Sequence, residues 1–325
     1  MKTTLYVCAL LLGLMLIPVE TLAQSDSLDY YILQGRRAMM GRELNIARAN
    51  YIKVLSIDPD NYEALTQLGV AFSGTGRNEQ ALVYFQRAYR MDTTDADLCN
   101  NIGAVHSNLS RRDEAIRFFS RAVMLAPDNP LYTSNLGQEY MKSGRLNDAL
   151  TWLHTADSLD PGRAVTEFAL GNTYAALRRY DDAERYYTRL VTGGATSAEL
   201  YYFLGTTQRN LGKDDEAKGS FESSLAMDPA NIQCRQSLGL LYLSNEKYAE
   251  ALPFFEEVVR QDSTFYPAWI SLGVCLALTD QHERVDHIAD RLDRVDSTMV
   301  PKMFHIIQSE INKRDNEQKL QELTN

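Results

Sequence analysis

Residues that could build a catalytic or metal site are scarce in this sequence. Its 325 residues include four cysteines and five histidines. Cys99, Cys234 and Cys275 remain if an N-terminal signal is removed, and they lie far apart. An odd, scattered set gives neither a disulfide framework nor a metal-ligand spacing, so we expect small buried side chains, with a single disulfide as the alternative.

Motifs for catalysis and nucleotide binding are also missing. His282 and His287 are five residues apart, whereas a helical zinc pair is spaced by four. Gly74-Thr75-Gly76 and Gly193-Gly194 occur outside any Walker or dinucleotide-binding context and indicate turns. We therefore expect no enzymatic activity, no metal and no cofactor.

Positive charge is in deficit. Lysine and arginine number 33 against 43 aspartates and glutamates, which gives a net charge of −10. Without a basic stripe, nucleic acid is not expected as a partner. The acidity also disfavours attachment to anionic membrane surfaces.

A long apolar run occurs only at the start of the chain. Lys2 precedes an apolar segment from Leu5 to Val19, and Thr21-Leu22-Ala23 matches a small-x-small cleavage site. These features predict a signal peptide at residues 1–23 and export to the periplasm of a Gram-negative bacterium, or secretion. The alternative is a membrane anchor, but a run of about 15 residues is short for a span. We expect no transmembrane segment in the mature chain.

What the sequence does contain is a fixed 34-residue period. Glycines recur at this spacing, and alanines follow each glycine by twelve residues, with Val285 in the last place. The glycines are Gly35, Gly69, Gly103, Gly137, Gly171, Gly205, Gly239 and Gly273, and the alanines are Ala47, Ala81, Ala115, Ala149, Ala183, Ala217 and Ala251. Such a period predicts stacked supersecondary units.

Placing each glycine at position 8 divides the chain into units. We expect a leader at residues 24–27, eight repeats, and a C-terminal capping helix with a polar tail at residues 300–325. The repeats are 28–61, 62–95, 96–129, 130–163, 164–197, 198–231, 232–265 and 266–299. Met303, Phe304, Ile307 and Ile311 form the apolar stripe expected to cover the last repeat.

Each unit shows two helical patterns. In the second unit Leu65, Leu68 and Phe72 recur at helical spacing between residues 62 and 73, and a second pattern runs from 78 to 91. Glycine in the first helix and alanine in the second allow the two backbones to approach closely. Large side chains are expected to flank that contact, at three residues and at sixteen residues after each glycine.

These residues resemble the tetratricopeptide repeat. The match is carried by Leu68-Gly69-x2-Phe72 with Ala81, Phe85 and Ala88, and by equivalent sets in other units. The resemblance implies an all-α, right-handed superhelix of eight helix-turn-helix repeats. Departures lie in the end units, with Gln34 and Ala38 in the first and Val285 and Ala289 in the eighth. His106 replaces an aromatic residue of the core, so we expect a buried, hydrogen-bonded ring.

The resemblance also implies that positions 2, 5, 6, 9, 12 and 13 face a concave groove. Its polar half would contain Gln67, Asn100, Asn101, Asn135, Gln138 and Asn172, with Asn108 at the margin. Amides can donate to and accept from the backbone of an extended peptide. Asn101 and Asn135 share one position in successive repeats and predict a short asparagine ladder. Alternatively, these side chains only solvate an exposed helix face.

The other half of the groove would be aromatic. Phe168 and Tyr202 share one position in successive repeats, with Phe203 beside them, and Lys142, Arg209 and Asn210 are expected on the same surface. Aromatic rings with a nearby arginine are typical of binding hot spots. The rings could instead belong to the core between repeats.

The predicted function is a non-catalytic scaffold that binds a protein or an extended peptide in this groove. The alternative is a glycan- or cell-wall-binding module that uses Phe168, Tyr202 and the amides. The charged clamp of chaperone-binding family members is not reproduced, because the corresponding places hold mainly Asn, Thr, Ser, Ala and Val.

Overall fold

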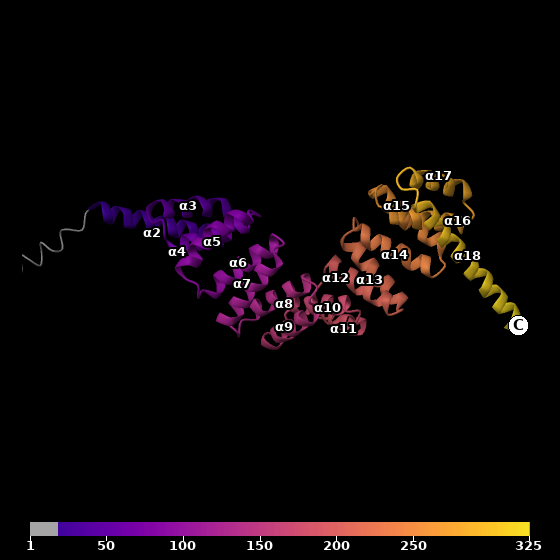
Figure 1. Cartoon of the computed structure of the whole chain (residues 1–325), viewed down its shortest axis with the longest axis horizontal. Coiled ribbons are helices and arrows are strands. Elements are labelled where there is room, and N and C mark those ends of the chain that lie inside the picture. Colours follow the sequence, from indigo (N-terminus) through magenta and orange to yellow (C-terminus); the bar gives the residue numbers. More distant parts are fainter. Residues whose placement is uncertain (1–18, 325) are drawn as a thin grey trace, which may run out of the picture. The chain divides into compact units, whose positions relative to one another are not determined.

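The computed structural model describes residues 19–324, with side chains from residue 27 to 313. This part of the chain contains seventeen helices, α2 to α18, and no strands, so the all-α prediction is confirmed (Figure 1). The helices form two compact units, one ending at Thr166 and the other beginning at Glu167. Each unit is a stack of helix pairs.

Unit 1 holds four complete helix pairs. Within a pair, a turn of three or four residues joins the first helix to the second, which packs against it. The helices are α2 (Val19–Met40), α3 (Leu44–Ile57), α4 (Tyr62–Ser73), α5 (Asn78–Met91), α6 (Ala96–Asn108), α7 (Arg112–Leu125), α8 (Pro130–Lys142) and α9 (Leu146–Leu159).

Unit 2 holds the remaining pairs and one further helix, and its boundary falls inside α10. The helices are α10 (Ala164–Ala176), α11 (Tyr180–Thr192), α12 (Ala198–Asn210), α13 (Asp214–Met227), α14 (Ile232–Ser244), α15 (Tyr248–Gln261), α16 (Tyr266–Ala277), α17 (His282–Asp293) and α18 (Met299–Thr324).

Side-chain caps determine where most first helices begin. The capping side chain accepts a hydrogen bond from a backbone N–H two or three residues further on, which satisfies a donor that the helix leaves unpaired. These caps are Asn61, Asp95, Asn129, Ser197 and Asn231.

The turn inside each repeat has the same backbone conformation throughout. Position 15 is left-handed in all eight repeats, with φ between 57° and 77°. Glycine occupies it in three repeats, while Arg42, Ser110, Arg178, Glu246 and Asp280 occupy it in the others. A side chain at such a φ strains the backbone, so glycine is the unstrained choice there. The sequence identified Gly76 as a turn residue but gave no sign that the non-glycine residues share its conformation.

The glycine ladder creates space for a large side chain from the second helix. A Cβ atom added to Gly103 would lie 2.8 Å from the ring of Phe119, sixteen residues later. At Gly205 the added atom would lie 2.9 Å from Phe221 and 3.2 Å from the carbonyl oxygen of Ala217. The backbones therefore do approach closely, but the large side chains lie directly on the glycines instead of beside them.

A second regular contact joins positions 11 and 23 of the same repeat. In four repeats two rings stack there, with centroids 5.3 to 5.7 Å apart and planes within 16° of parallel. In the sixth repeat, Ser220 donates a 2.7 Å hydrogen bond to Gln208 instead. The stacked pairs are Phe72–Tyr84, His106–Phe118, Tyr174–Tyr186 and Tyr242–Phe254.

Helix α18 closes unit 2, as expected for a capping helix. Met303 and Ile307 are buried against the core of the last repeat. Phe304 and Ile311 are 47% and 37% exposed, so only half of the expected apolar stripe makes the cap. The side chains of the predicted polar tail beyond Lys313 lie outside the described set.

Most of the expected signal peptide lies outside the described residues. Helix α2 begins at Val19 and passes through the expected leader at residues 24–27 without a break. Among the helices described, none combines the length and hydropathy that a membrane span requires.

Cys99, Cys234 and Cys275 are free and buried, as the sequence predicts.

Candidate binding site

The polar half of the predicted groove contains a small pocket in unit 1. Its volume is about 130 Å³, and helices α6 and α8 supply most of its lining. Asn108, Asn135, Gln138 and Lys142 line it, together with Ala104, Ser107, Phe119 and Glu139. The structure thus brings together three of the predicted site residues and the marginal Asn108.

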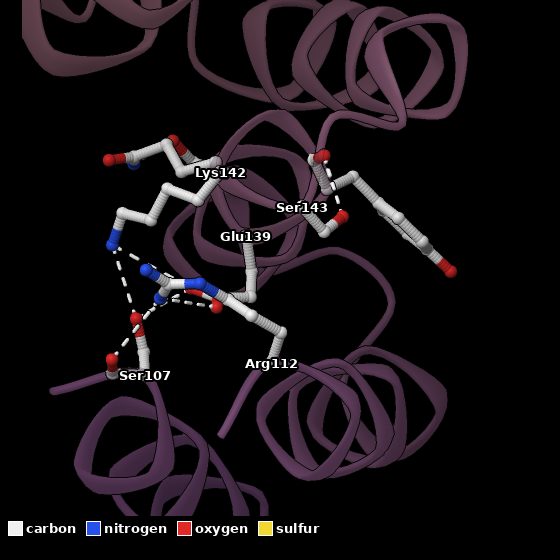
Figure 2. Close-up of polar contacts among 8 residues, drawn as sticks. Ser107, Arg112, Glu139, Lys142 and Ser143 are labelled. Atoms are coloured by element: carbon white, nitrogen blue, oxygen red, sulfur yellow. Dashed lines mark hydrogen bonds and ion pairs between the residues drawn. The ribbon is translucent and has the colours of Figure 1, made fainter. Parts of the chain in front are cut away.

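A buried carboxylate lies at the back of this pocket. Glu139 is 1% exposed, and its Oε1 lies 3.0 Å from Nη1 of Arg112. Ser107 donates a 2.5 Å hydrogen bond to Glu139 Oε2, and Lys142 Nζ lies 3.6 Å from the same oxygen. Figure 2 shows Arg112 of α7 and Lys142 of α8 both directed at Glu139 and Ser107.

This cluster fixes the position of Lys142. Its ammonium also donates to Ser107 Oγ at 3.1 Å, so Lys142 is held by two partners although its side chain is 45% exposed. Two cations then share one carboxylate, and the local charge is +1. Lys142 therefore lines the polar pocket of unit 1. A surface that it shares with Arg209 and Asn210 stays a prediction.

Sequence reasoning missed Glu139, Arg112 and Ser107. The sequence did contain one signal that could have revealed this cluster. Glu139 places a charge at position 10, which is uncharged in the neighbouring third and fifth repeats, where Val105 and Thr173 stand. A carboxylate at a core position is buried only when it is paired, which would have prompted a search for its cation.

The predicted asparagine ladder takes a different form. Nδ2 of Asn135 donates a 2.8 Å hydrogen bond to Oδ1 of Asn100, so Asn100, and not Asn101, is its partner in the preceding repeat. Gln138 donates to Ser134 Oγ at 3.2 Å. Asn101 and Gln67 are half-buried and line neither this pocket nor the one in unit 2.

A larger pocket lies in unit 2. It has a volume of about 420 Å³ and is lined by α10, α11 and α12. The predicted residues Asn172 and Asn210 stand in its wall, beside Ala175, Ala176, Tyr180, Tyr187, Phe203, Thr206 and Thr207. The lining therefore combines apolar surface with two amide groups.

Intramolecular hydrogen bonds orient both amides of this pocket. Tyr187 donates its hydroxyl to Asn172 Oδ1 at 2.7 Å, and Asn210 Nδ2 donates to the carbonyl oxygen of Thr206 at 2.7 Å. These bonds leave Nδ2 of Asn172 as a donor and Oδ1 of Asn210 as an acceptor for a ligand. The buried hydroxyl of Thr206 has no hydrogen-bond partner among the described residues. Burial raises the pKa of Tyr187, so its hydroxyl keeps the proton it donates.

The predicted aromatic surface is partly built into the core. Phe168 is half-buried, with its ring centroid 6.0 Å from Tyr187 and 5.7 Å from Phe203. Tyr202 is also half-buried, 5.5 Å from Phe203 and 6.2 Å from Phe221. Phe203 is the aromatic residue of this group that lines the pocket. Arg209 is half-buried and is not part of the pocket lining.

His106 is buried in unit 1, as expected, and its ring stacks on Phe118 at 5.6 Å. The expected hydrogen bond is not made at Nδ1, which has no partner within the described part of the chain. Burial lowers the pKa of His106, because an imidazolium would lose its hydration there. The ring therefore acts as an aromatic member of the core.

Comparison with known proteins agrees with this architecture. Family models described as "Tetratricopeptide repeat" match residues 32–96, 96–129, 168–232 and 232–260. A curated protein, the CTR9 homolog of Arabidopsis thaliana, is 43% identical over 54 residues, which span 17% of this chain and 5% of the relative.

Solved structures show the same fold at low sequence identity. A tetratricopeptide repeat protein from Parabacteroides merdae is 15% identical and has a TM-score of 0.60, with 77% of this chain and 99% of the other covered. YrrB, described as a TPR protein with an unusual peptide-binding site, is 21% identical and has a TM-score of 0.50, with 57% and 96% covered.

Proposed function

The chain belongs to the tetratricopeptide repeat family, and on that premise we propose that it is a non-catalytic scaffold that binds a partner protein through an extended peptide segment. Two pockets contain residues at predicted groove positions, and amide groups contribute to the lining of both. The peptide-binding site named for YrrB supports this choice of ligand by analogy alone.

The observation that carries the proposal is the pair of oriented amides in unit 2. A residue of an extended peptide presents one C=O and one N–H, and Asn172 Nδ2 and Asn210 Oδ1 supply the complementary donor and acceptor. Phe203 and Ala175 give the apolar surface for the side chain of that residue. The open volume of about 420 Å³ is ample for one such side chain.

The polar pocket of unit 1 would bind a neighbouring part of the same partner. Its amides, Asn108, Asn135 and Gln138, can contact polar backbone or side-chain groups. The single net positive charge around Glu139 gives a weak preference for acidic segments. A glycan-binding role would need Phe168 and Tyr202 as an open aromatic shelf, and their packing against Phe203 does not favour it.

We further propose that the protein acts outside the cytoplasm. The basis is the expected signal peptide at residues 1–23. Appearance of the mature chain in the periplasmic fraction, with an N-terminus at Gln24, would support this location. Retention of the full-length chain in the cytoplasm would contradict it.

Selection of binding peptides from a random library tests the function. Peptides selected by the wild-type protein should bind at least about tenfold more weakly to the double variant Asn172→Ala and Asn210→Ala, because each lost hydrogen bond contributes about 1 kcal/mol. Asn147→Ala, an exposed amide in α9, is the matched control and should leave affinity unchanged. Failure to select peptides, or equal binding by the double variant, overturns the assignment.

A further inference from the structure

The pockets of the two units stand at the same place in the repeat. Every residue that lines the unit 1 pocket has a counterpart in the lining of the unit 2 pocket 68 residues later, which is two repeats. Ser107 corresponds to Ala175, for example, and Asn135 corresponds to Phe203. The fold therefore provides one kind of pocket between successive repeats, and the side chains decide what it can hold.

The ion cluster of unit 1 is replaced by uncharged side chains in unit 2. The cluster at the unit 1 pocket consists of Ser107, Arg112, Glu139 and Lys142 (Figure 2). In the same order, the counterparts in unit 2 are Ala175, Tyr180, Thr207 and Asn210, and all four line the unit 2 pocket. The open volume is about 420 Å³ there, against about 130 Å³ in unit 1.

A small residue at position 12 contributes to this open space. Ala175 stands at that position, whereas the first, fourth, sixth and seventh repeats hold Met39, Met141, Arg209 and Leu243 there. Because Ala175 is part of the pocket wall, a longer side chain at this place would extend into the open volume. The size of the residue at position 12 therefore limits what the pocket can accept.

The lining of the unit 2 pocket suits a large, uncharged side chain. Two rings of its wall, Tyr187 and Phe203, are nearly parallel, with centroids 6.3 Å apart and planes at 15°. Aromatic side chains bury a large area and gain specific contacts from offset or edge-on packing against other rings. A charged side chain would lose hydration without gaining an ion-pair partner, because no residue of the lining is charged.

We propose that the unit 2 pocket binds a large aromatic side chain of the partner's extended segment, and that Ala175 makes room for it. This inference rests on the proposed function, in which Asn172 and Asn210 hold the backbone of the same residue. The ring of the ligand lies against Tyr187 and Phe203, in the space that corresponds to the ion cluster of unit 1.

Selection from a random peptide library shows whether the partner residue is aromatic. Peptides selected by the wild-type protein should share a phenylalanine, tyrosine or tryptophan at one position. Replacing that residue with alanine should weaken binding at least about tenfold, as measured by isothermal titration calorimetry. Leucine at the same place should give an intermediate affinity, and glutamate should bind no better than alanine.

A double-mutant cycle tests whether the ring enters this pocket. Ala175→Met narrows the pocket, and the fold accommodates methionine at position 12 because the first and fourth repeats carry it there. The selected peptides should bind this variant at least about tenfold more weakly, and replacing their aromatic residue should then cost less than about threefold. Ala277→Met, at position 12 of the eighth repeat and outside the pocket, is the matched control and should behave as the wild type. Far-ultraviolet circular dichroism checks that both variants are folded.

The outcomes separate this inference from the proposed function. If the selected peptides depend on Asn172 and Asn210 but need no aromatic residue, the aromatic preference is overturned and the proposed function stands. The same conclusion follows if replacing the aromatic residue costs equally on the wild type and on Ala175→Met. If no peptide is selected, both proposals are overturned.

A small probe gives a readout that needs no selected peptide. N-acetyl-phenylalaninamide carries one aromatic ring and one peptide-like backbone, and its ring should shift the methyl resonances of Ala175 and Ala176 in the NMR spectrum. The methyl resonance of Ala277 should not move, and N-acetyl-leucinamide at the same concentration should cause smaller shifts. Equal shifts with the two probes, or no shift at Ala175, would overturn the aromatic preference.

Discussion

Met303 of α18 packs onto Gly273 of α16, at the place where a side chain of the second helix lies in the other repeats. The residue sixteen positions after Gly273 is Ala289, which is too small to fill that space. The C-terminal helix thus supplies the side chain that the last repeat lacks, which explains why unit 2 ends with an extra helix.

Replacing Met303 should therefore destabilise the protein. Met303→Ala leaves a cavity over Gly273 and should lower the free energy of unfolding by about 2–5 kcal/mol. Phe304→Ala, whose side chain is 47% exposed, should cost much less. Denaturant unfolding followed by circular dichroism measures both, and equal effects would show that α18 is not a cap.

The glycine ladder predicts a second pair of contrasting variants. A Cβ at Gly137 would lie 2.7 Å from Leu153 Cγ and 3.1 Å from its backbone nitrogen, so Gly137→Val should cost several kcal/mol, about 3 or more, through overpacking. Gly219 lies inside α13 with open space around it, and Gly219→Ala should stabilise the protein by about 0.5–1 kcal/mol. Identical melting curves for the wild type and Gly137→Val would refute the packing account.

The left-handed turn position predicts stabilising substitutions. Ser110 and Arg178 have φ near 59° and 58°, and replacing either with glycine should raise the free energy of unfolding by about 1 kcal/mol. The reverse change, Gly144→Ala at φ 77°, should lower it by a similar amount. Thermal denaturation of the three single variants checks the signs, and a destabilised Ser110→Gly would contradict the strain argument.

Two tyrosines that cover ladder glycines differ in one hydrogen bond. The hydroxyl of Tyr51 is buried without a partner among the described residues, and burial raises its pKa to about 12. Tyr51→Phe should be neutral or stabilising, whereas Tyr187→Phe, which breaks the bond to Asn172, should cost about 1 kcal/mol. Chemical denaturation of the two variants compares them directly, and a greater loss for Tyr51→Phe would point to an unrecognised partner.

The stability of the fold around the buried carboxylate of Glu139 depends on the cations that pair with it. Arg112→Met removes a 3.0 Å ion pair from Glu139 and should lower stability by about 1–3 kcal/mol. Adding Glu139→Gln to Arg112→Met removes the stranded charge and should restore part of the loss. Arg90→Met, at an exposed position of α5, should change stability by less than about 0.5 kcal/mol. If Arg112→Met lowers the free energy of unfolding no more than Arg90→Met does, then Lys142 and Ser107 alone are enough to stabilise the buried carboxylate of Glu139.

The 34-residue period can be recognised in the sequence because one residue type marks it. The space over Gly35, Gly69 or Gly103 admits no Cβ without displacement, so the 34-residue period is visible without any structure. The turn conformation was hidden where it is occupied by Ser110 or Arg178, since those side chains do not reveal a left-handed φ.

The candidate site was harder to predict for a geometric reason. The position of a residue in its repeat predicts whether it faces the groove, but it does not predict which rotamer the side chain adopts there. Asn135 therefore reaches Asn100 and not Asn101, and Phe168 turns toward Tyr187. Glu139 was missed because it stands at position 10, which is not among the expected groove positions where polar side chains were sought.

The contact of each ladder glycine with a side chain sixteen residues later has a kinetic consequence. Because both partners belong to one helix pair, a hairpin can form its tightest contact before any neighbour has folded, and closing so short a loop costs little chain entropy. Folding can then begin in any central repeat and spread in both directions, with a low mean sequence separation between contacting residues and a correspondingly fast rate. The last repeat is the exception. The side chain that packs on Gly273 is Met303, thirty residues later, so this contact forms only when α18 docks on the repeat.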